Sequence, residues 1–405
     1  MIKYTDGGVC AAKGFKGAGI HCGFRKNQSK KDLALIYSEA PCSAAAVYTQ
    51  NLVQGAPIAV TKKHLANGTA KAVICNSGNA NTCNANGAYI AETTCELLAK
   101  ELGISADDII VASTGVIGVE MTMAPFEAGI APLVAALGED GSADVNEAIM
   151  TTDTKPKQCA VSFTAGGREC HIGGVAKGSG MIHPNMATML VFVTSDCAIS
   201  PEMLQTALSA DVQDSFNMIS VDGDTSTNDM VAVMCNGLAG NETITAPGAD
   251  YDAFCEALAA VTQQLCRGIA ADGEGASKLL TCAVSGAVDK AAARTAAKSV
   301  ICSALLKAAM FGADANWGRV LCAIGYSGAD VDVNKIGVTF KSAAGSVEVC
   351  KAGSGVPFSE EEAKKVLSES EIDIIVTAGY GPGSATAWGC DLTYEYVHIN
   401  GDYRT

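Results

Sequence analysis

The sequence has no apolar stretch that approaches the ~18 uncharged residues of a membrane-spanning helix. The first twenty residues carry no signal-peptide core, and they lack the arginine and serine typical of a transit peptide. Charged residues make up only 18% of the 405, and the formal net charge is −15. An acidic chain is a poor partner for nucleic acid or an anionic membrane surface. We therefore expect a cytoplasmic globular protein that binds neither of them.

The motifs of metal and cofactor proteins are also missing. The 17 cysteines include no CxxC pair, and the two nearest, Cys75 and Cys83, are eight positions apart. This spacing excludes zinc ribbons, iron–sulfur runs and thioredoxin-like motifs, and it favours small core residues in a reducing compartment. There is no P-loop or HExxH, and the acidic run at 222–229 lacks the glutamate that ends a calcium loop. We expect no bound metal and no cofactor.

Strand-like and helix-like segments alternate along the whole chain, which predicts a mixed α/β fold. Apolar runs predict strands at 71–75, 108–112 and 188–193, with a loop at 76–87 and a turn at 113–118. Helices are predicted from 88 to a stop at Gly103, from Ser200, from 251 to a stop at Gly268, and from Ser359. No internal repeat or linker divides the chain, so these elements should share one core.

The segment KGSGMIHPNMATML at 177–190 carries the most specific chemistry. Gly178 and Gly180 permit unusual backbone conformations, Pro184 fixes a turn, and Ala187 offers an unhindered carbonyl before Thr188. A threonine hydroxyl needs a base, and cutting the chain before it creates an α-amino group with a pKa of roughly 7.7–8.0. We interpret Ala187–Thr188 as a self-cleavage site and Thr188 as an acyl-transfer nucleophile. Periodicity alone would make Thr188 an ordinary strand residue.

Thr114 and Gly115 end another apolar strand. A glycine N–H there can point at a developing oxyanion, and the threonine hydroxyl can donate a second hydrogen bond. A plain turn that needs glycine is the alternative interpretation.

Other polar residues are unremarkable when each is taken alone. Lys177 and Glu274 lie in glycine-containing loops, where a charged side chain is usually solvated. Thr151 belongs to a polar run, and the tail at 398–405 would ordinarily be disordered. His183 could assist cleavage as a base, although its position beside a turn proline explains it equally well.

Several segments together resemble the bifunctional ornithine acetyltransferase / glutamate N-acetyltransferase family of arginine biosynthesis. The resemblance covers essentially the whole chain. Its motifs are KGFKGAGIHCGFRK near the start, NSGNAN at 76–81, STGVIG at 113–118, TTDT at 151–154, KGSGMIHPNMATML at 177–190, DGDTSTND at 222–229, ADGEGASKL at 271–279 and GADANWGR at 312–319.

The resemblance implies a role for individual residues. Thr188 becomes the catalytic nucleophile after cleavage between Ala187 and Thr188, and Thr114 with Gly115 forms the oxyanion hole. The residues implied to contact substrate are Thr151, Lys177, Thr188, Glu274, Asn400 and Thr405. Thr152 would replace Thr151 if the alignment slips by one position.

The resemblance also implies a fold, a reaction and an assembly. The fold is layered α/β, with sheets between helices, and is related to the DmpA-type aminopeptidases. Residues 1–187 form an α chain and 188–405 a β chain, which completes the core to about 280 and adds a second lobe at about 281–405. Two such units form an α2β2 heterotetramer. An acetyl group passes from N2-acetylornithine to glutamate through a threonyl ester, without coenzyme or metal, and acetyl-CoA is a possible second donor.

Two alternatives remain at this point. A self-processing aminopeptidase or amidase of the same architecture would pass the acyl group to water instead of glutamate. A non-catalytic cysteine-rich binding or storage protein would stay uncut and hold metal, although the cysteine spacing argues against it.

Overall fold

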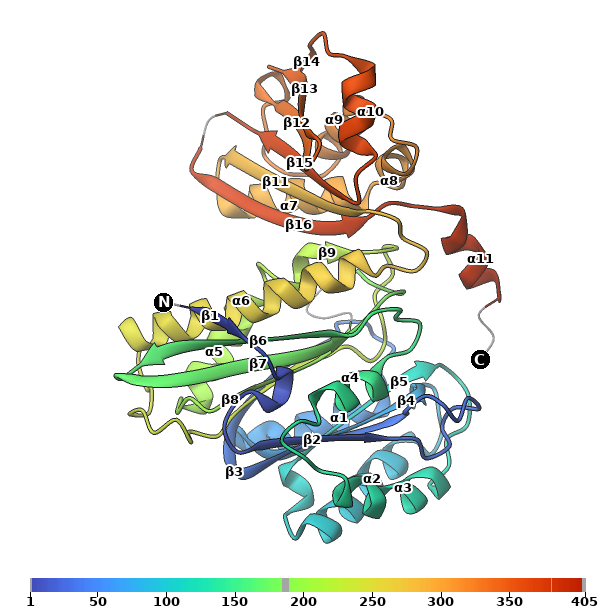
Figure 1. The fold of residues 1–405 in the computed structure, drawn as a ribbon, viewed down its shortest axis with the longest axis vertical. Coiled ribbons are helices and arrows are strands. Elements are labelled where there is room, and N and C mark those ends of the chain that lie inside the picture. The colour runs from blue at the N-terminus through green and yellow to red at the C-terminus, as the bar shows by residue number, and fades with distance from the viewer. Residues whose placement is uncertain (1, 184–188, 380, 403–405) are drawn as a thin grey trace.

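The structure, a computed structural model, describes residues 2–183, 189–379 and 381–402. Ala187, Thr188 and Thr405 therefore lie outside the described residues. The described chain is built from two sheets with helices packed against them, which confirms the expected mixed α/β class (Figure 1). None of its helices combines the length and the apolar character that crossing a bilayer requires.

The first sheet has nine strands in the described residues, in the order β1-β6-β7-β8-β10-β3-β4-β5 with β2 paired to β3. The strands are β1 Lys3–Thr5, β2 Phe15–Ile20, β3 Leu33–Tyr48, β4 Thr69–Asn79, β5 Ile109–Val116, β6 Lys157–Ala165, β7 Arg168–Lys177, β8 Leu190–Ser195 and β10 Met230–Cys235. β7 and β8 are antiparallel neighbours, with Lys177 opposite Leu190. Both ends of the segment that contains the Ala187–Thr188 bond are therefore fixed at one point of this sheet.

Helices cover different parts of this sheet. They are α1 Ala56–His64, α2 Gly87–Leu102, α3 Ala124–Ala135, α4 Ser142–Ile149, α5 Pro201–Asp211 and α6 Ala249–Ala271. Buried apolar residues of α2 and α3 form one core with β3, β4 and β5, whereas those of α5 and α6 form another with β6, β7 and β8. α4 contributes Val145 and Ala148 to a third core, between the sheet's two halves.

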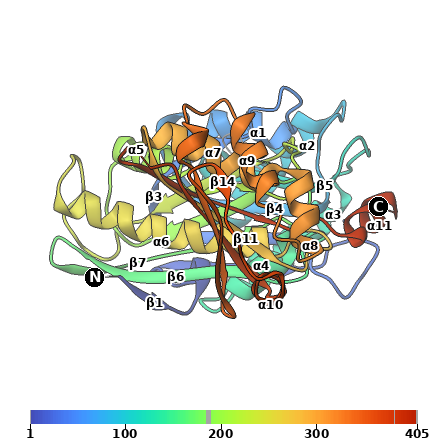
Figure 2. The same cartoon turned by 90° about the horizontal axis from the view of Figure 1, so that it is seen from above.

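The second sheet lies in a separate lobe, in the order β14-β13-β12-β15-β11-β16-β9, and its strands run across those of the first (Figure 2). The strands are β9 Ile219–Ser220, β11 Leu279–Ala287, β12 Gly337–Ser342, β13 Gly345–Lys351, β14 Ser354–Gly355, β15 Glu371–Thr377 and β16 Gly383–Cys390. The helices after β11 are α7 Lys290–Cys302, α8 Ala304–Phe311, α9 Trp317–Gly325, α10 Glu360–Leu367 and α11 Tyr394–Asp402.

The two lobes are joined through β9. This short strand belongs to the second sheet although it lies between α5 and β10 in sequence, and its Ile219 pairs with Trp388 of β16. Lys298 of α7 reinforces the junction by donating hydrogen bonds to the carbonyl oxygens of Asn217 (2.7 Å) and Ile219 (2.6 Å).

The helix boundaries were predicted well where a capping residue marks them. The Ser200 hydroxyl accepts a hydrogen bond from the Met203 N–H at the start of α5, and Ser359 does the same for Glu362 at the start of α10. Gly103 ends α2 with a left-handed φ of 67°.

Other boundaries were wrong. β4 continues to Asn79 and β5 to Val116, so the predicted loop at 76–87 starts too early and the predicted turn at 113–118 is strand as far as Val116. Parallel pairing of the two strands, with Gly78 opposite Gly115, outweighs the low strand propensity of these residues. α6 passes through Gly268 to Ala271, and the tail predicted to be disordered forms α11 as far as Asp402.

Candidate active site

All the predicted site residues that the structure describes line one pocket. They are Thr114, Gly115, Thr151, Lys177, Glu274 and Asn400, and Thr152 lies beside them. The pocket volume is about 140 Å³, below the roughly 300–1,000 Å³ of pockets for drug-sized ligands. The site is therefore of a size for a small metabolite.

A wider hollow of about 530 Å³ lies between α6 and the second lobe and contains none of the predicted residues. Its charged lining residues already have partners in the fold, because Lys290 pairs with Asp214 and Asp289 caps α7 by accepting a hydrogen bond from the Ala292 N–H. We therefore place the chemistry in the smaller pocket.

Thr114 and Gly115 lie near the end of β5. Gly115 has a φ of +133°, and a Cβ atom there would lie 2.3 Å from the carbonyl carbon of Gly78 on β4. Only glycine fits this position. The Thr114 hydroxyl accepts a hydrogen bond from the ammonium group of Lys177 at 3.2 Å, which brings the ends of β5 and β7 together.

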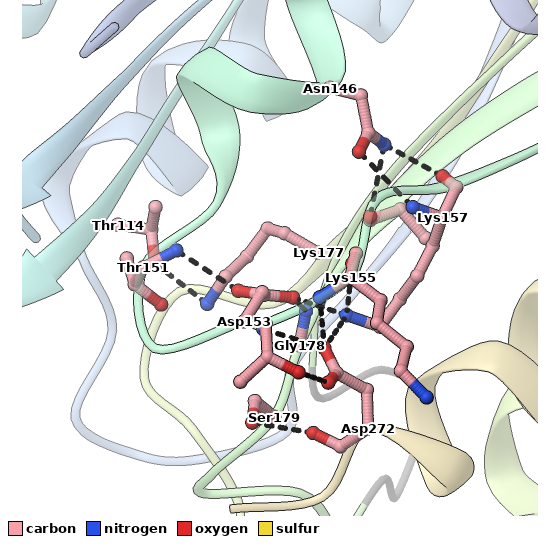
Figure 3. Close-up of polar contacts among 12 residues, drawn as sticks. Thr114, Asn146, Thr151, Asp153, Lys155, Lys157, Lys177, Gly178, Ser179 and Asp272 are labelled. Atoms are coloured by element: carbon pink, nitrogen blue, oxygen red, sulfur yellow. Dashed lines mark hydrogen bonds and ion pairs between the residues drawn. The ribbon is translucent and has the colours of Figure 1, made fainter. Parts of the chain in front are cut away.

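A buried cluster of three charged residues lies beside the pocket residues Thr151 and Lys177 (Figure 3). The ammonium group of Lys157 is 2.6 Å from the carboxylates of both Asp153 and Asp272. Asp153 also accepts hydrogen bonds from the backbone N–H groups of Thr151 (3.0 Å) and Gly178 (2.7 Å). The cluster thus ties the loop that carries Thr151 to the end of the strand that carries Lys177.

Asp272 connects the third segment of the site, at the end of α6. Its carboxylate accepts hydrogen bonds from the Thr154 backbone at 3.0 Å and from the Thr154 hydroxyl, and its carbonyl accepts one from Ser179 at 2.6 Å. Burial alone would raise the pKa of Asp153, but Lys157 and Lys177 favour its ionised form and lower the pKa to about 2. Asp153 is therefore ionised at neutral pH.

Glu274 and Asn400 close the other side of the pocket. The Asn400 side chain on α11 donates a hydrogen bond to the Glu274 carboxylate at 2.8 Å, although the two residues are far apart in sequence. Gly180 packs against the same carboxylate, since a Cβ atom there would lie 2.3 Å from it. Glu274 is only 9% exposed.

The segment at 220–225 anchors the residues that precede the predicted cleavage site. The Asp222 carboxylate accepts hydrogen bonds from the backbone N–H groups of Met181 (2.6 Å) and Ile182 (2.9 Å), and Met181 has a left-handed φ of 56°. The Thr225 hydroxyl donates to the His183 carbonyl at 2.8 Å. Asp222 belongs to the acidic run at 222–229, which lacks the final glutamate of a calcium loop. Its carboxylate here binds backbone N–H groups.

His183 does not line the pocket. Its Nδ1 atom lies 3.1 Å from the Ser220 hydroxyl and 3.6 Å from the Cys302 thiol, at the junction of the lobes. Burial lowers the pKa of His183 to about 4, with a further contribution from Lys298, so the imidazole is neutral near pH 7. These contacts favour the structural interpretation of His183.

Sequence reasoning missed the residues that hold the site together. They are Asp153, Lys157, Asp272 and Asn228, none of which was singled out. The Asn228 side chain donates hydrogen bonds to the carbonyl oxygens of Ala80 (2.5 Å) and Ser113 (3.0 Å), which fixes β5 beside Thr114.

A search among known proteins finds relatives along the full length. Residues 16–405 match the model of the ArgJ family. The arginine biosynthesis bifunctional protein ArgJ of Symbiobacterium thermophilum is 51% identical over 406 residues, with 100% of both chains covered. The protein of the same name from Bacillus subtilis is 48% identical, with 100% of this chain and 98% of that protein covered.

A solved structure is similar to about half of the chain. The crystal structure of the arginine biosynthesis bifunctional protein ArgJ from Bacillus halodurans is 46% identical and superimposes with a TM-score of 0.50. The match covers 53% of this chain but 98% of the solved one. The solved chain is therefore about half as long as this one.

Proposed function

The chain belongs to the ArgJ family, whose members are acetyltransferases of arginine biosynthesis, and on this premise we propose that it transfers an acetyl group from N2-acetylornithine to glutamate. The products are ornithine and N-acetylglutamate. The observation that carries the proposal is that Thr114, Gly115, Thr151, Lys177, Glu274 and Asn400 line a single pocket. These residues come from five separate stretches of the chain, and only folding brings them together.

The reaction proceeds in two halves on Thr188. The Thr188 hydroxyl gives its proton to its own α-amino group and attacks the acetyl carbonyl of N2-acetylornithine. Thr114 and Gly115 stabilise the tetrahedral oxyanion. Ornithine leaves with a proton, an acetyl ester remains on Thr188, and the amine of glutamate attacks that ester to form N-acetylglutamate.

The charged residues of the pocket suit amino-acid substrates. Lys177 pairs with the α-carboxylate that both substrates share, and Thr151 contacts the same ligand. Glu274, held by Asn400, faces an ammonium group of ornithine. Thr405 completes the contacts.

Cleavage between Ala187 and Thr188 produces the nucleophile. The division into an α chain, 1–187, and a β chain, 188–405, is supported by the pairing of Lys177 with Leu190 at either end of the cleaved segment. It is also supported by the half-length chain of the solved relative. In this proposal the β chain completes the first lobe to about residue 280 and forms the second lobe from about 281.

The enzyme works in the cytoplasm as an α2β2 heterotetramer and needs neither coenzyme nor metal. Among the described residues, no group of three or more His, Cys, Asp or Glu side chains is placed to hold a metal ion. Acetyl-CoA is proposed as a second acetyl donor for glutamate, and acetylglutamate formation with acetyl-CoA as the sole donor tests this part of the proposal.

The test combines a denaturing gel with two assays. We expect the purified protein to give two fragments of about half size, and Thr188→Ala to give one uncut band without activity. Acetylglutamate should form from N2-acetylornithine, and free acetate should not replace it as the main product, as it would for an amidase. An active protein that runs as a single uncut chain contradicts the proposal.

A further inference from the structure

Asp229 is a buried carboxyl beside Met189, the residue that follows the predicted nucleophile in the sequence. It directly precedes β10, which pairs in parallel with β8 so that Met230 lies opposite Leu190. The Met230 N–H donates a hydrogen bond to the carbonyl oxygen of Met189 at 2.9 Å. Since Met189 follows Thr188 directly in the sequence, this pairing fixes Asp229 next to the start of the proposed β chain.

One oxygen of this carboxyl has no hydrogen-bond partner. Asp229 is only 3% exposed, and its Oδ2 atom lacks a partner among residues 2–183, 189–379 and 381–402. Leaving a buried polar atom unsatisfied costs about 1–3 kcal/mol, and more for a charged group. An orphaned carboxyl oxygen in this position therefore calls for a ligand.

A small cavity adjoins this carboxyl. Asp229 lines it together with Thr114, Lys177 and Met189, and its volume is about 20 Å³. A cavity of about 10–15 Å³ is enough for one water molecule. The space therefore suits a single small polar group, such as a water molecule or an amine.

The electrostatics of the cavity favour an amine as its occupant. Burial raises the pKa of Asp229 well above its usual range, while Ser226 and Lys177 act in the opposite direction. A cation entering the cavity would satisfy the free oxygen and favour the ionised carboxylate. The Lys177 ammonium also lines the cavity, and the negative charge of the Asp229 carboxylate offsets its repulsion of a second cation.

We propose that Asp229 is a positioning residue that accepts a hydrogen bond from the α-amino group of Thr188 in the processed enzyme. The inference rests on the proposed function, because only cleavage creates that amine. The hydroxyl proton of Thr188 moves to the amine, and the Asp229 carboxylate stabilises the resulting ammonium without forming or breaking a covalent bond. Glu274 is a weaker candidate for this role, because its carboxylate already accepts a hydrogen bond from Asn400.

The test is Asp229→Asn, which keeps the shape of the side chain and removes its charge. We expect the variant to be cleaved, to melt at the same temperature as wild type or higher, and to keep KM within about threefold. Its kcat should fall about 10²-fold, the loss that misplacing a catalytic group typically causes. A purely structural residue would instead lower the melting temperature and leave the kcat of the cleaved protein unchanged.

Asp211→Asn is the matched control. Asp211 is a partly buried carboxyl whose pKa burial raises to about 6, but it contacts Ser215 and Thr262 and lines neither the pocket nor the cavity. The kcat of the Asp211→Asn variant should equal that of the wild-type enzyme. If Asp229→Asn did not fold, Asp229→Ser would be measured in the same way.

Two results would overturn the inference. One is a cleaved Asp229→Asn enzyme with a kcat within twofold of wild type. The other is a folded variant that stays uncut, which would place Asp229 in the cleavage step. If the wild-type chain itself were active without being cut, the proposed function would fail instead, so the two failures are distinguishable.

Discussion

The ammonium nitrogen of Lys177 lies 3.2 Å from the hydroxyl oxygen of Thr114, although β7 and β5 are not neighbours in the sheet. A lysine ammonium can only donate, so Thr114 must accept in this contact. The hydroxyl hydrogen of Thr114 is then free to donate to another oxygen. The contact therefore orients Thr114 as an oxyanion donor.

Thr114→Val should test this role, since valine keeps the branched shape and removes the hydroxyl. We expect kcat to fall about 10²–10³-fold, as is typical when one oxyanion donor is lost. The melting temperature should change little, because the Thr114 hydroxyl contacts one partly exposed lysine. Steady-state kinetics of acetylglutamate formation measure the effect.

Thr114→Ser is the matched control, because it retains the hydroxyl and should stay within about tenfold of wild type. Equal kcat values for the valine and serine variants would show that the Thr114 hydroxyl does not stabilise the oxyanion.

Lys177→Met should weaken substrate binding as well as the contact to Thr114. A hydrogen bond to a charged group contributes about 1.5–3 kcal/mol, which corresponds to about 10–100-fold in kcat/KM. The control is Lys155→Met, whose exposed side chain lies in the loop before β6 and outside the pocket. If both variants lost activity equally, a general charge effect would explain the result better than a carboxylate contact.

Much of the site could be predicted because its residues fall in specific motifs. Thr114, Lys177 and Glu274 lie in three separate motifs, and the structure brings all three to one pocket. Asn400 was predicted only through the resemblance, since no pattern in a polar tail indicates that α11 would bring it to Glu274. That contact depends on tertiary packing.

The supporting residues could not be predicted from local patterns. Asp153 and Lys157 are four positions apart and resemble an ordinary surface ion pair, while Asp272 is more than a hundred residues away. Their burial results from the packing of α6 against β6 and the loop before it. The extension of β5 through Gly115 was missed for a similar reason, since pairing with Gly78 on β4 overrides local propensity.

Lys157→Met should destabilise the protein strongly. It leaves the buried carboxylates of Asp153 and Asp272 without their shared cation, and breaking a buried pair in this way costs about 3–5 kcal/mol. Denaturant unfolding monitored by circular dichroism measures the loss. The control is Lys63→Met, which removes a surface pair with Glu92 at 3.7 Å and should cost at most about 1 kcal/mol. Comparable losses of unfolding free energy in both variants would contradict a stabilising role for the buried cluster.

Acid should weaken the native state through Asp153. Its pKa falls from the usual 3.8 to about 2 on folding, so the ionised carboxylate stabilises the native state above pH 3.8. This contribution is lost as the pH drops from about 4 toward 2, and it amounts to about 2 kcal/mol. Asp153→Asn should flatten the stability curve in that window, whereas Glu127→Gln on the exposed face of α3 should not. If the stability of the wild-type protein did not change between pH 4 and 2, the lowered pKa of Asp153 would be disproved.

Gly180→Ala should weaken substrate binding while leaving the stability of the protein almost unchanged. The new Cβ atom would lie 2.3 Å from the Glu274 carboxyl group, so this flexible side chain must move away from Asn400. Because only the end of a side chain shifts, we expect a small change in melting temperature but a KM for N2-acetylornithine at least tenfold higher. Such a rise matches the loss of about 1.4 kcal/mol of binding free energy.

Gly325→Ala is the control for that substitution, since an added Cβ atom at the end of α9 has no neighbour within 4 Å. It should leave KM unchanged and should not lower stability, because alanine is the better helix former. If Gly180→Ala bound N2-acetylornithine as well as Gly325→Ala does, the position of Glu274 would not matter for the substrate. Its contact with Asn400 would then serve only to fasten α11 to the first lobe.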